Sequence, residues 1–311
     1  VQSFQQARQA DPNGWADAKG YLNILAISGG GPNGAFGAGL LNGWSASGTR
    51  PTFKIVTGIS AGALIAPFAF VGPEYDKTLK TLCTELIRKD ILSLRPIVSV
   101  VGGHRPIADI TPVSQLLAEL VDEHFLAAVG RAHEEGRRLL IGTVNLDARR
   151  LVIWDMGAIA ASGRADALDL FRKVLLASVS IPVAFRPAYI PVAANGAKYD
   201  EMHVDGGVIT QVLFHSPTLA IHAAMKQAGV KEEPRLRIYI LRNSHFRVAY
   251  EPVKPRLLPI ATRSLLSLTT AGGVGDLYRI YAFSQRDAID FNLIAIPSDY
   301  VRGSKRQVDP E

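Results

Sequence analysis

Short apolar runs alternate with polar or glycine-rich turns along this chain, and their lengths are typical of buried strands. These runs predict strands at residues 22–28, 53–57, 138–145, 150–154, 235–242 and 292–296. Between them, apolar residues recur at the three- and four-residue spacing of helices with one packed face. The clearest such segment follows Thr111-Pro112 and contains Val113, Leu116, Leu117, Leu120 and Val121. A second predicted helix starts at Ser216-Pro217 and ends before Gly229, since a hydroxyl cap, an early proline and a following glycine are typical helix boundaries.

The alternation of strands and helices predicts an α/β fold, a three-layer sandwich with helices on both faces of a central sheet. Residues 139–145 and 151–154 flank the polar segment 146–150, which has the composition of a hairpin turn. The central sheet is therefore predicted to be mixed. No linker or repeat divides the chain, so we expect an N-terminal extension at 1–20 and a single catalytic domain at 21–311.

Composition is consistent with a compact enzyme, because 311 residues with 48% hydrophobic content can form one large core. The longest apolar runs, such as Ala63 to Val71, stop well short of the roughly 18 residues that a membrane span needs. The net charge is +6, and the basic residues are dispersed. A mildly cationic surface would favour anionic lipid membranes, and it would equally be inert solvated charge. We expect no nucleic-acid partner.

The sequence leaves the compartment and the oligomeric state open. The chain starts at Val1, and residues 2–20 are polar. Removal of a leader would produce such a start. We therefore expect a soluble or peripheral-membrane protein, and export to the periplasm is compatible with this expectation.

Gly58-Ile59-Ser60-Ala61-Gly62 is the most informative motif for chemistry. It follows a β-branched run and precedes an apolar helical segment. This strand-turn-helix context is that of a nucleophile elbow, in which Gly58 and Gly62 leave room for an exposed serine hydroxyl. Ser60 is the predicted nucleophile.

The second motif is the glycine-rich loop that follows the first predicted strand. Backbone N–H groups of Gly29, Gly30 and Gly31 can converge on one anion, such as the oxygen of a tetrahedral intermediate. Gly29, Gly31 and Gly34 also match the dinucleotide spacing G-x-G-x-x-G. That alternative is weaker, because no acidic residue stands about 20 positions further on to bind a ribose.

The third motif is Asp205-Gly206-Gly207, an aspartate followed by a glycine turn. Alone it predicts only a loop. Together, these three motifs resemble the patatin-like phospholipase family. The resemblance extends to Leu176–Pro187, Gly142–Asp147 and Arg286–Leu293, and it spans about residues 22 to 300.

The resemblance implies a patatin-like sandwich and hydrolysis of phospholipids or related lipid esters by a serine-aspartate dyad without cofactor or metal. Carried onto this chain, Ser60 is the nucleophile and Asp205 the base. Gly29, Gly30 and Gly31 supply the oxyanion hole, and Gly206 and Gly207 form the supporting turn. The chain departs from the family near Asn33, where many members carry arginine or lysine. This departure makes neutral or differently charged esters more plausible substrates, unless Asn33 only supports a turn.

Two other functions remain open at this stage. The first is a hydrolase with a serine-histidine-aspartate triad, for which His215 and His245 follow Asp205 in the chain. The elbow comes early for that fold, since one clear strand precedes the strand that leads to Ser60. The second is a lipid-binding protein without turnover.

The substrate pocket is the least defined part of the prediction. Residues 92–105 and 252–268 are candidate lid segments, and Leu257-Leu258-Pro259-Ile260 predicts an apolar rim at the entrance. His203 is a candidate for the pocket mouth, against an ordinary strand position. Acidic residues do not have the spacing of a calcium loop.

Overall fold

The structure of the protein is a computed structural model. It describes residues 16–88, 110–194, 196–214, 234–246, 250 and 252–297. The strands are β1 (Tyr21–Ile27), β2 (Ile55–Gly58), β3 (Arg138–Asn145), β4 (Arg150–Asp155), β5 (Ala188–Ala194), β6 (Ala197–Asp205), β7 (Arg235–Arg242) and β8 (Asp290–Ala295). The α-helices are α2 (Gly34–Ala46), α3 (Ala61–Val71), α4 (Asp76–Arg88), α5 (Thr111–Leu120), α6 (Glu123–Glu134), α7 (Met156–Ala160), α8 (Ala167–Ser178) and α10 (Leu257–Arg286). Short 3₁₀ turns are η1 (Gly31–Asn33), η2 (Pro73–Tyr75) and η4 (Gly206–Val208).

All eight strands form one mixed sheet in the order β5-β6-β3-β2-β1-β7-β8, and β4 pairs with β3. The pairs among β3, β2, β1, β7 and β8 are parallel, whereas β4 and β6 run antiparallel to β3. The predicted hairpin is confirmed, because Asn145 pairs with Arg150. The hairpin of β5 and β6 was not predicted.

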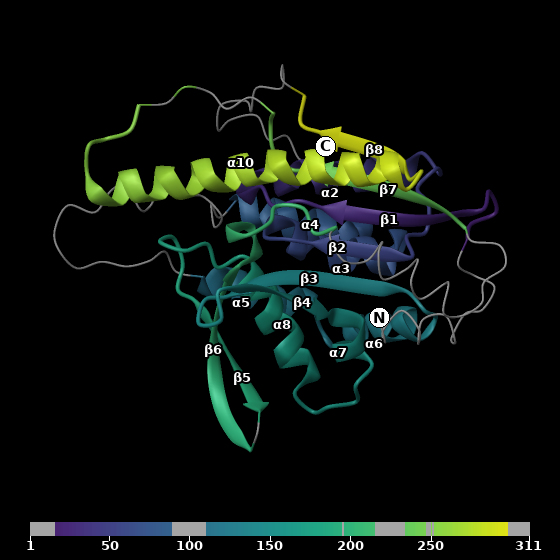
Figure 1. Ribbon diagram of the computed structural model, residues 1–311. Helices are drawn as coiled ribbons and strands as arrows, with labels where there is room; N and C mark the ends of the chain where they lie inside the picture. Colours follow the sequence, from purple (N-terminus) through teal and green to yellow (C-terminus); the bar gives the residue numbers. More distant parts are fainter. Residues whose placement is uncertain are drawn as a thin grey trace.

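The sheet is the middle layer of the predicted sandwich, and Figure 1 shows the helices around it. One face packs against α2 to α8 through a large apolar cluster that includes Phe68, Phe125 and Phe171. The other face carries Ile24, Ile238 and Ile240, which pack with Leu277 and Ile280 of α10. Strand residues alternate between these two clusters, so each central strand is buried on both faces. The predicted α/β class with helices on both faces is confirmed.

Two predicted helices have different outcomes. The helix at Thr111-Pro112 is present, but Thr111 is its first helical residue and Ile110 is the cap. The helix predicted from Ser216-Pro217 lies outside the described residues. Within the described ranges, no helix is long and apolar enough to cross a membrane.

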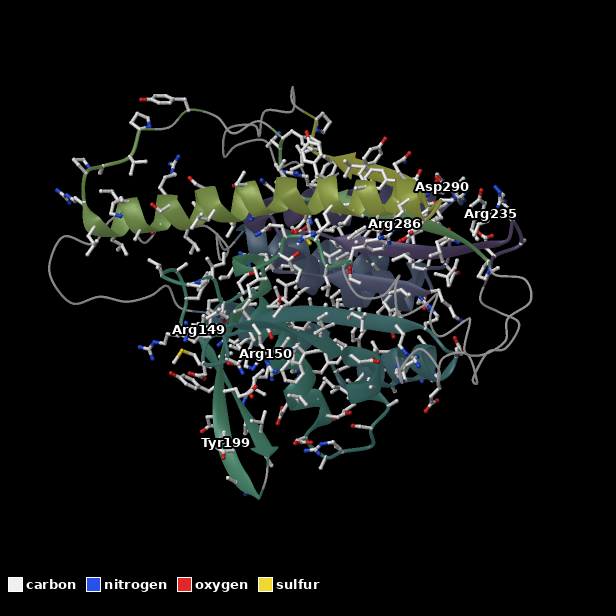
Figure 2. All side chains as sticks on the ribbon, viewed as in Figure 1. Arg149, Arg150, Tyr199, Arg235, Arg286 and Asp290 are labelled. Atoms are coloured by element: carbon white, nitrogen blue, oxygen red, sulfur yellow. The ribbon has the colours of Figure 1, made fainter. Side chains whose placement is uncertain are left out.

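The basic side chains are dispersed, as the sequence predicts. Figure 2 shows Arg149 and Arg150 at the β3–β4 turn, while Arg235 lies at the start of β7, at the opposite end of the sheet.

A buried aspartate anchors α10 to the loop that follows β6. Asp276 is 2% exposed, and its Oδ2 accepts hydrogen bonds from the Thr210 hydroxyl (2.9 Å) and the Gln211 N–H (2.7 Å). A longer bond of 3.2 Å comes from the Val212 N–H, and Arg279 pairs with the other carboxylate oxygen. One side chain therefore fixes α10 against three consecutive loop residues.

We expect Asp276→Asn to lower the free energy of unfolding by about 2–4 kcal/mol, because hydrogen bonds to a buried charge would be weakened or lost. Urea denaturation measures the change. Asp200→Asn is the matched control, since Asp200 is exposed on β6. Equal stability of the two variants would contradict the anchoring role of Asp276.

Candidate active site

Ser60 stands on a strained turn between β2 and α3. Its backbone has φ 54° and ψ −128°, a conformation that non-glycine residues seldom adopt. A Cβ added to Gly58 would lie 2.8 Å from the Ala66 Cβ, and one added to Gly62 would lie 2.7 Å from the Ser28 carbonyl oxygen. Both flanking positions therefore need glycine for steric reasons, as the elbow motif predicts.

The carboxylate of Asp205 lies beside the Ser60 hydroxyl. Asp205 ends β6, and the pairing of Thr143 with Asp205 attaches it to β3. Its Oδ1 accepts a hydrogen bond from the Gly207 N–H at 2.7 Å, and the Ser60 side chain makes another hydrogen bond to the carboxylate. Burial raises the pKa of Asp205 to about 7, although the bonds from Ser60 and Gly207 act in the opposite direction. A carboxyl group with this pKa can take up and release a proton near neutral pH.

The glycine loop reaches the same place because β1 and β2 are parallel neighbours. Ile27 pairs with Gly58, so their carboxyl ends lie side by side. A Cβ on Gly29 would lie 3.2 Å from the Ser60 Cβ. The Gly29 N–H donates to the Gln211 carbonyl at 3.3 Å, whereas no acceptor for the Gly30 and Gly31 N–H groups is found in the described part of the chain. Of the three, Gly30 and Gly31 therefore have N–H groups that are not engaged within the described part of the chain.

The end of α8 and the residues that follow it hold Ser60 and Asp205 through their backbones. The Ser178 hydroxyl accepts a hydrogen bond from the Ser60 N–H at 3.1 Å and donates to the Gly142 carbonyl at 2.8 Å. The Ser180 carbonyl accepts from the Asp205 N–H at 3.0 Å. Residues 176–187, which carry part of the family resemblance, thus position Ser60 and Asp205 relative to each other.

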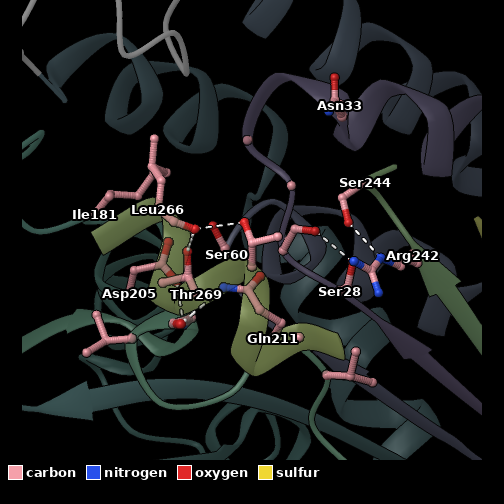
Figure 3. Close-up of a pocket in the computed structure, with 18 of the residues that line it drawn as sticks. Ser28, Asn33, Ser60, Ile181, Asp205, Gln211, Arg242, Ser244, Leu266 and Thr269 are labelled. Carbon is pink, nitrogen blue, oxygen red and sulfur yellow. Dashed lines mark hydrogen bonds between the residues drawn. The ribbon is translucent and has the colours of Figure 1, made fainter. Parts of the chain in front are cut away.

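A cavity of about 370 Å³ opens over Ser60 and Asp205. Figure 3 shows Ser60 between Asp205 on one side and Ser28, Arg242 and Ser244 on the other. The wall opposite the glycine loop comes from α10, through Leu265, Leu266, Thr269, Thr270 and Gly273. The lining of the cavity as a whole is mostly apolar.

Of the other candidate residues, two line the cavity and one does not. Asn33 and His245 line the cavity. His203 does not: it is fully buried between Thr143 and Glu201, with ring nitrogens 2.9 Å and 3.1 Å from their side-chain oxygens. The ordinary strand interpretation of His203 is therefore the correct one.

Two further candidates, His215 and the segment 92–105, lie outside the described residues. Most of the second lid candidate, 252–268, forms the start of α10 from residue 257 onward, and its Leu265 and Leu266 line the cavity. In the described ranges, no three His, Cys, Asp or Glu side chains are grouped so that they could hold a metal ion.

Four residues that shape the site were not predicted from the sequence: Ser178, Gln211, Arg242 and Asp276. Ser178 stood in a recognised segment, but its bond to the Ser60 N–H joins residues 118 positions apart. Gln211 and Asp276 act through a loop and helix whose contact no local pattern specifies. Arg242 ends a predicted strand, and a charged residue at the carboxyl end of a central strand was a signal that could have been used.

Comparison with known proteins supports this arrangement at the level of the family. The model of the patatin-like phospholipase family matches residues 25–217, more than half of the chain, and the match includes both Ser60 and Asp205. No curated protein sequence matches. Among solved structures, the crystal structure of VipD from Legionella pneumophila is similar, with 13% sequence identity and a TM-score of 0.41. The similarity covers 92% of this chain and 63% of that one, so this chain spans less than two thirds of VipD.

The match and the α/β sandwich point to the same conclusion: the chain belongs to the patatin-like phospholipase family.

Proposed function

We propose that the protein is a serine lipid acyl hydrolase in which Ser60 attacks the ester carbonyl and Asp205 is the base. The observation that carries this proposal is the placement of the buried Asp205 carboxylate beside the Ser60 side chain, with both residues lining the same cavity. The match of residues 25–217 to a phospholipase family supports the choice of a lipid ester as substrate. We further propose that residues 21–311 act as one catalytic domain, because strands from β1 to β8 share a single sheet.

The reaction proceeds in two proton-balanced halves. Asp205 takes the hydroxyl proton as the Ser60 oxygen bonds to the carbonyl carbon, and it returns the proton to the leaving alcohol when the ester C–O bond breaks. Water then attacks the acyl-enzyme, Asp205 takes its proton, and that proton returns to Ser60 as the fatty acid leaves. A carboxylate is ordinarily a weak base for a hydroxyl, and the raised pKa of Asp205 lessens this mismatch.

The negative charge of the tetrahedral intermediate needs donors that are already in place. The N–H groups of Gly30 and Gly31, for which no acceptor is found among the described residues, supply them in this proposal. Gly29 supports the loop through its bond to Gln211, so its contribution to the oxyanion hole is the smaller one. The N–H of Ser60 itself is occupied by Ser178.

The alternative with a catalytic histidine is less well supported. His245 lines the cavity, but in the described part of the structure the hydrogen-bond partners of the Asp205 carboxylate are Ser60 and Gly207. A triad needs the imidazole between the serine and the acid. The Ser60 side chain itself acts on the Asp205 carboxyl, and no histidine among the described residues contributes to the pKa shift of that group. The polar pair of Ser60 and Asp205 likewise favours turnover over simple lipid binding.

The first half of α10 is the surface we assign to membrane contact. Leu257 and Leu268 are 87% and 71% exposed, and Ile260 is also exposed. Figure 1 shows this half of α10 extending past the ends of β1 and β7. Its inner side lines the cavity through Leu265 and Leu266, while Lys254 and Arg256 lie exposed just before it. An apolar surface beside basic residues suits an anionic lipid membrane.

Substitution of the reacting pair tests the proposal. We expect Ser60→Ala and Asp205→Asn each to lower kcat/KM for fatty-acid release by at least about 1,000-fold, because nucleophile and base act as one unit. Release is measured from short-chain esters and phospholipid vesicles in the presence of a chelator. The wild type should remain active under chelation.

His245→Ala serves as the control that separates dyad from triad. It should retain activity within about tenfold of the wild type, because His245 lies in the cavity wall without a bond to Asp205. A loss as large as that of Ser60→Ala would instead support a triad. An inactive wild type that binds lipid vesicles and leaves Ser60 unlabelled by a fluorophosphonate would support the lipid-binding alternative.

The pKa of Asp205 sets an expected pH dependence. The carboxylate must be ionised to act as base, and its pKa is raised to about 7 by burial. The value of kcat/KM should therefore fall as pH drops below 7 and level off above it. A pH titration of short-ester hydrolysis measures this. A profile that stays flat down to pH 5 would contradict the role of a buried Asp205.

Charges placed on the outer side of α10 test the membrane surface. The double variant Leu257→Asp, Leu268→Asp should weaken binding to anionic vesicles and lower long-chain ester turnover, while hydrolysis of soluble short esters stays near the wild-type rate. Co-sedimentation and fatty-acid release measure the two effects. The same substitutions at the exposed Tyr189 and Tyr199 of the β5–β6 hairpin provide a control. Unchanged vesicle binding of the α10 variant would refute the assignment.

A further inference from the structure

Arg242 is a buried cation with no acidic partner in the described part of the protein. Its side chain lies at the carboxyl end of β7 and is among the residues that line the cavity, yet the residue is only 3% exposed. Its Nε donates to the Ser244 hydroxyl at 2.8 Å, and the guanidinium lies 4.6 Å from the ring centre of Phe246. Its Nη1 is buried and has no hydrogen-bond partner.

Such an arrangement is unfavourable without a ligand. A guanidinium carries five N–H donors, and burial without a counter-ion costs free energy that hydrogen bonds to neutral groups only partly offset. Burial also lowers the pKa of Arg242. The other arginines of β7 contrast with it: Arg237 pairs with Asp290, and Arg235 is exposed over the Tyr21 ring. Of the three, Arg242 is the one that faces the cavity.

The position of Arg242 relative to the reacting groups limits what its partner can be. Figure 3 places Arg242 and Ser244 across Ser60 from Asp205, beside Ser28 and the glycine loop. Ser28 lies directly before this loop, and its N–H bonds to the Leu241 carbonyl, which fixes the end of β7 against it. An anion held by Arg242 therefore lies in the same cavity as the Ser60 hydroxyl. A single substrate molecule can then carry both the anion and the ester. Asn33, which also lines the cavity, is uncharged.

We infer that Arg242 and Ser244 form an anion subsite that binds the phosphodiester of a phospholipid while its acyl ester lies at Ser60. The planar guanidinium matches two phosphate oxygens, and Ser244 aligns it through Nε. The inference rests on the proposed hydrolase function and extends it from lipid esters in general to phosphate-bearing ones. It also supplies a cation from β7, although the glycine loop carries none.

A matched pair of substrates tests the subsite. Dioleoylphosphatidylglycerol and dioleoylglycerol share acyl chains and differ in the phosphodiester, and both are presented in the same neutral-detergent micelles. We expect Arg242→Gln to lower kcat/KM for the phospholipid about 10- to 100-fold more than for the diacylglycerol. The loss in Arg242→Lys should lie between those of the wild type and Arg242→Gln, because a lysine keeps the charge and loses the paired donors. Arg235→Gln, at the far end of the same strand, should leave the ratio unchanged (Figure 2).

Thermal unfolding separates binding from a structural role. Removal of a buried charge without a counter-ion should leave the Tm of Arg242→Gln at or above that of the wild type. An equal loss of turnover on both substrates, with a lower Tm, would overturn the inference. The inference would also be overturned if the wild type and Arg242→Gln both hydrolysed the two substrates with equal kcat/KM.

A binding measurement keeps the test independent of turnover. Calorimetry on Ser60→Ala protein should detect glycerophosphocholine, and the additional change Arg242→Gln should abolish the signal. Binding of inorganic phosphate without binding of the diester would overturn the headgroup assignment in favour of a free-anion site. If the wild type hydrolyses no ester, the proposed function fails. The calorimetry still tests the subsite in that case, because binding of the diester that is lost in Arg242→Gln supports it and binding that is unchanged contradicts it.

Discussion

The close approach of α3 to the end of β1 is the contact on which the site depends. Gly62 packs against the carbonyl groups of Ile27 and Ser28, where any side chain would push α3 away from the sheet. Ser60 is held at positive φ by this packing, at a cost of about 1–3 kcal/mol. Burial of all residues from Ala61 to Phe70 offsets that strain. The same contact sets Gly29 against Ser60, so Ser60 and the glycine loop are positioned by one interface.

Two buried aspartates show how their surroundings assign different roles to the same side chain. Asp276 accepts hydrogen bonds from three loop groups and pairs with Arg279, so its charge is well compensated and it serves as an anchor. Asp205 has one N–H and one hydroxyl as partners, and no charged group lowers its pKa. The poor compensation of Asp205 is what raises its pKa toward 7 and gives it basicity. Asp276 contributes indirectly, because it holds the 210–212 loop and α10 over the cavity.

Local sequence patterns predicted the parts of the structure that local physics decides. The central strands, the β3–β4 turn and the glycines around Ser60 each follow from burial or from steric need at one position. The β5–β6 hairpin was missed because the outer part of β6, Tyr199 to Glu201, is polar and largely solvent-facing, so it lacks the apolar run of a buried strand. Helix α10 was not predicted, because Gly272, Gly273 and Gly275 lower helix propensity, and packing of Leu277 and Ile280 overrides that effect. Ser178 and Arg242 depend on register between distant segments, and no single segment encodes that register.

The separation of charge within the cavity connects catalysis to substrate choice. A guanidinium in contact with Asp205 would lower the pKa of that carboxyl and remove the basicity that the proposed mechanism needs. Ser60 and the glycine loop stand between the two groups, so Arg242 can attract an anion without compensating Asp205. A phosphate bound at Arg242 would in turn neutralise the cation and exclude water from that end of the cavity. Closing the site in this way would keep Asp205 desolvated during the reaction, so that substrate binding itself would help to maintain the base.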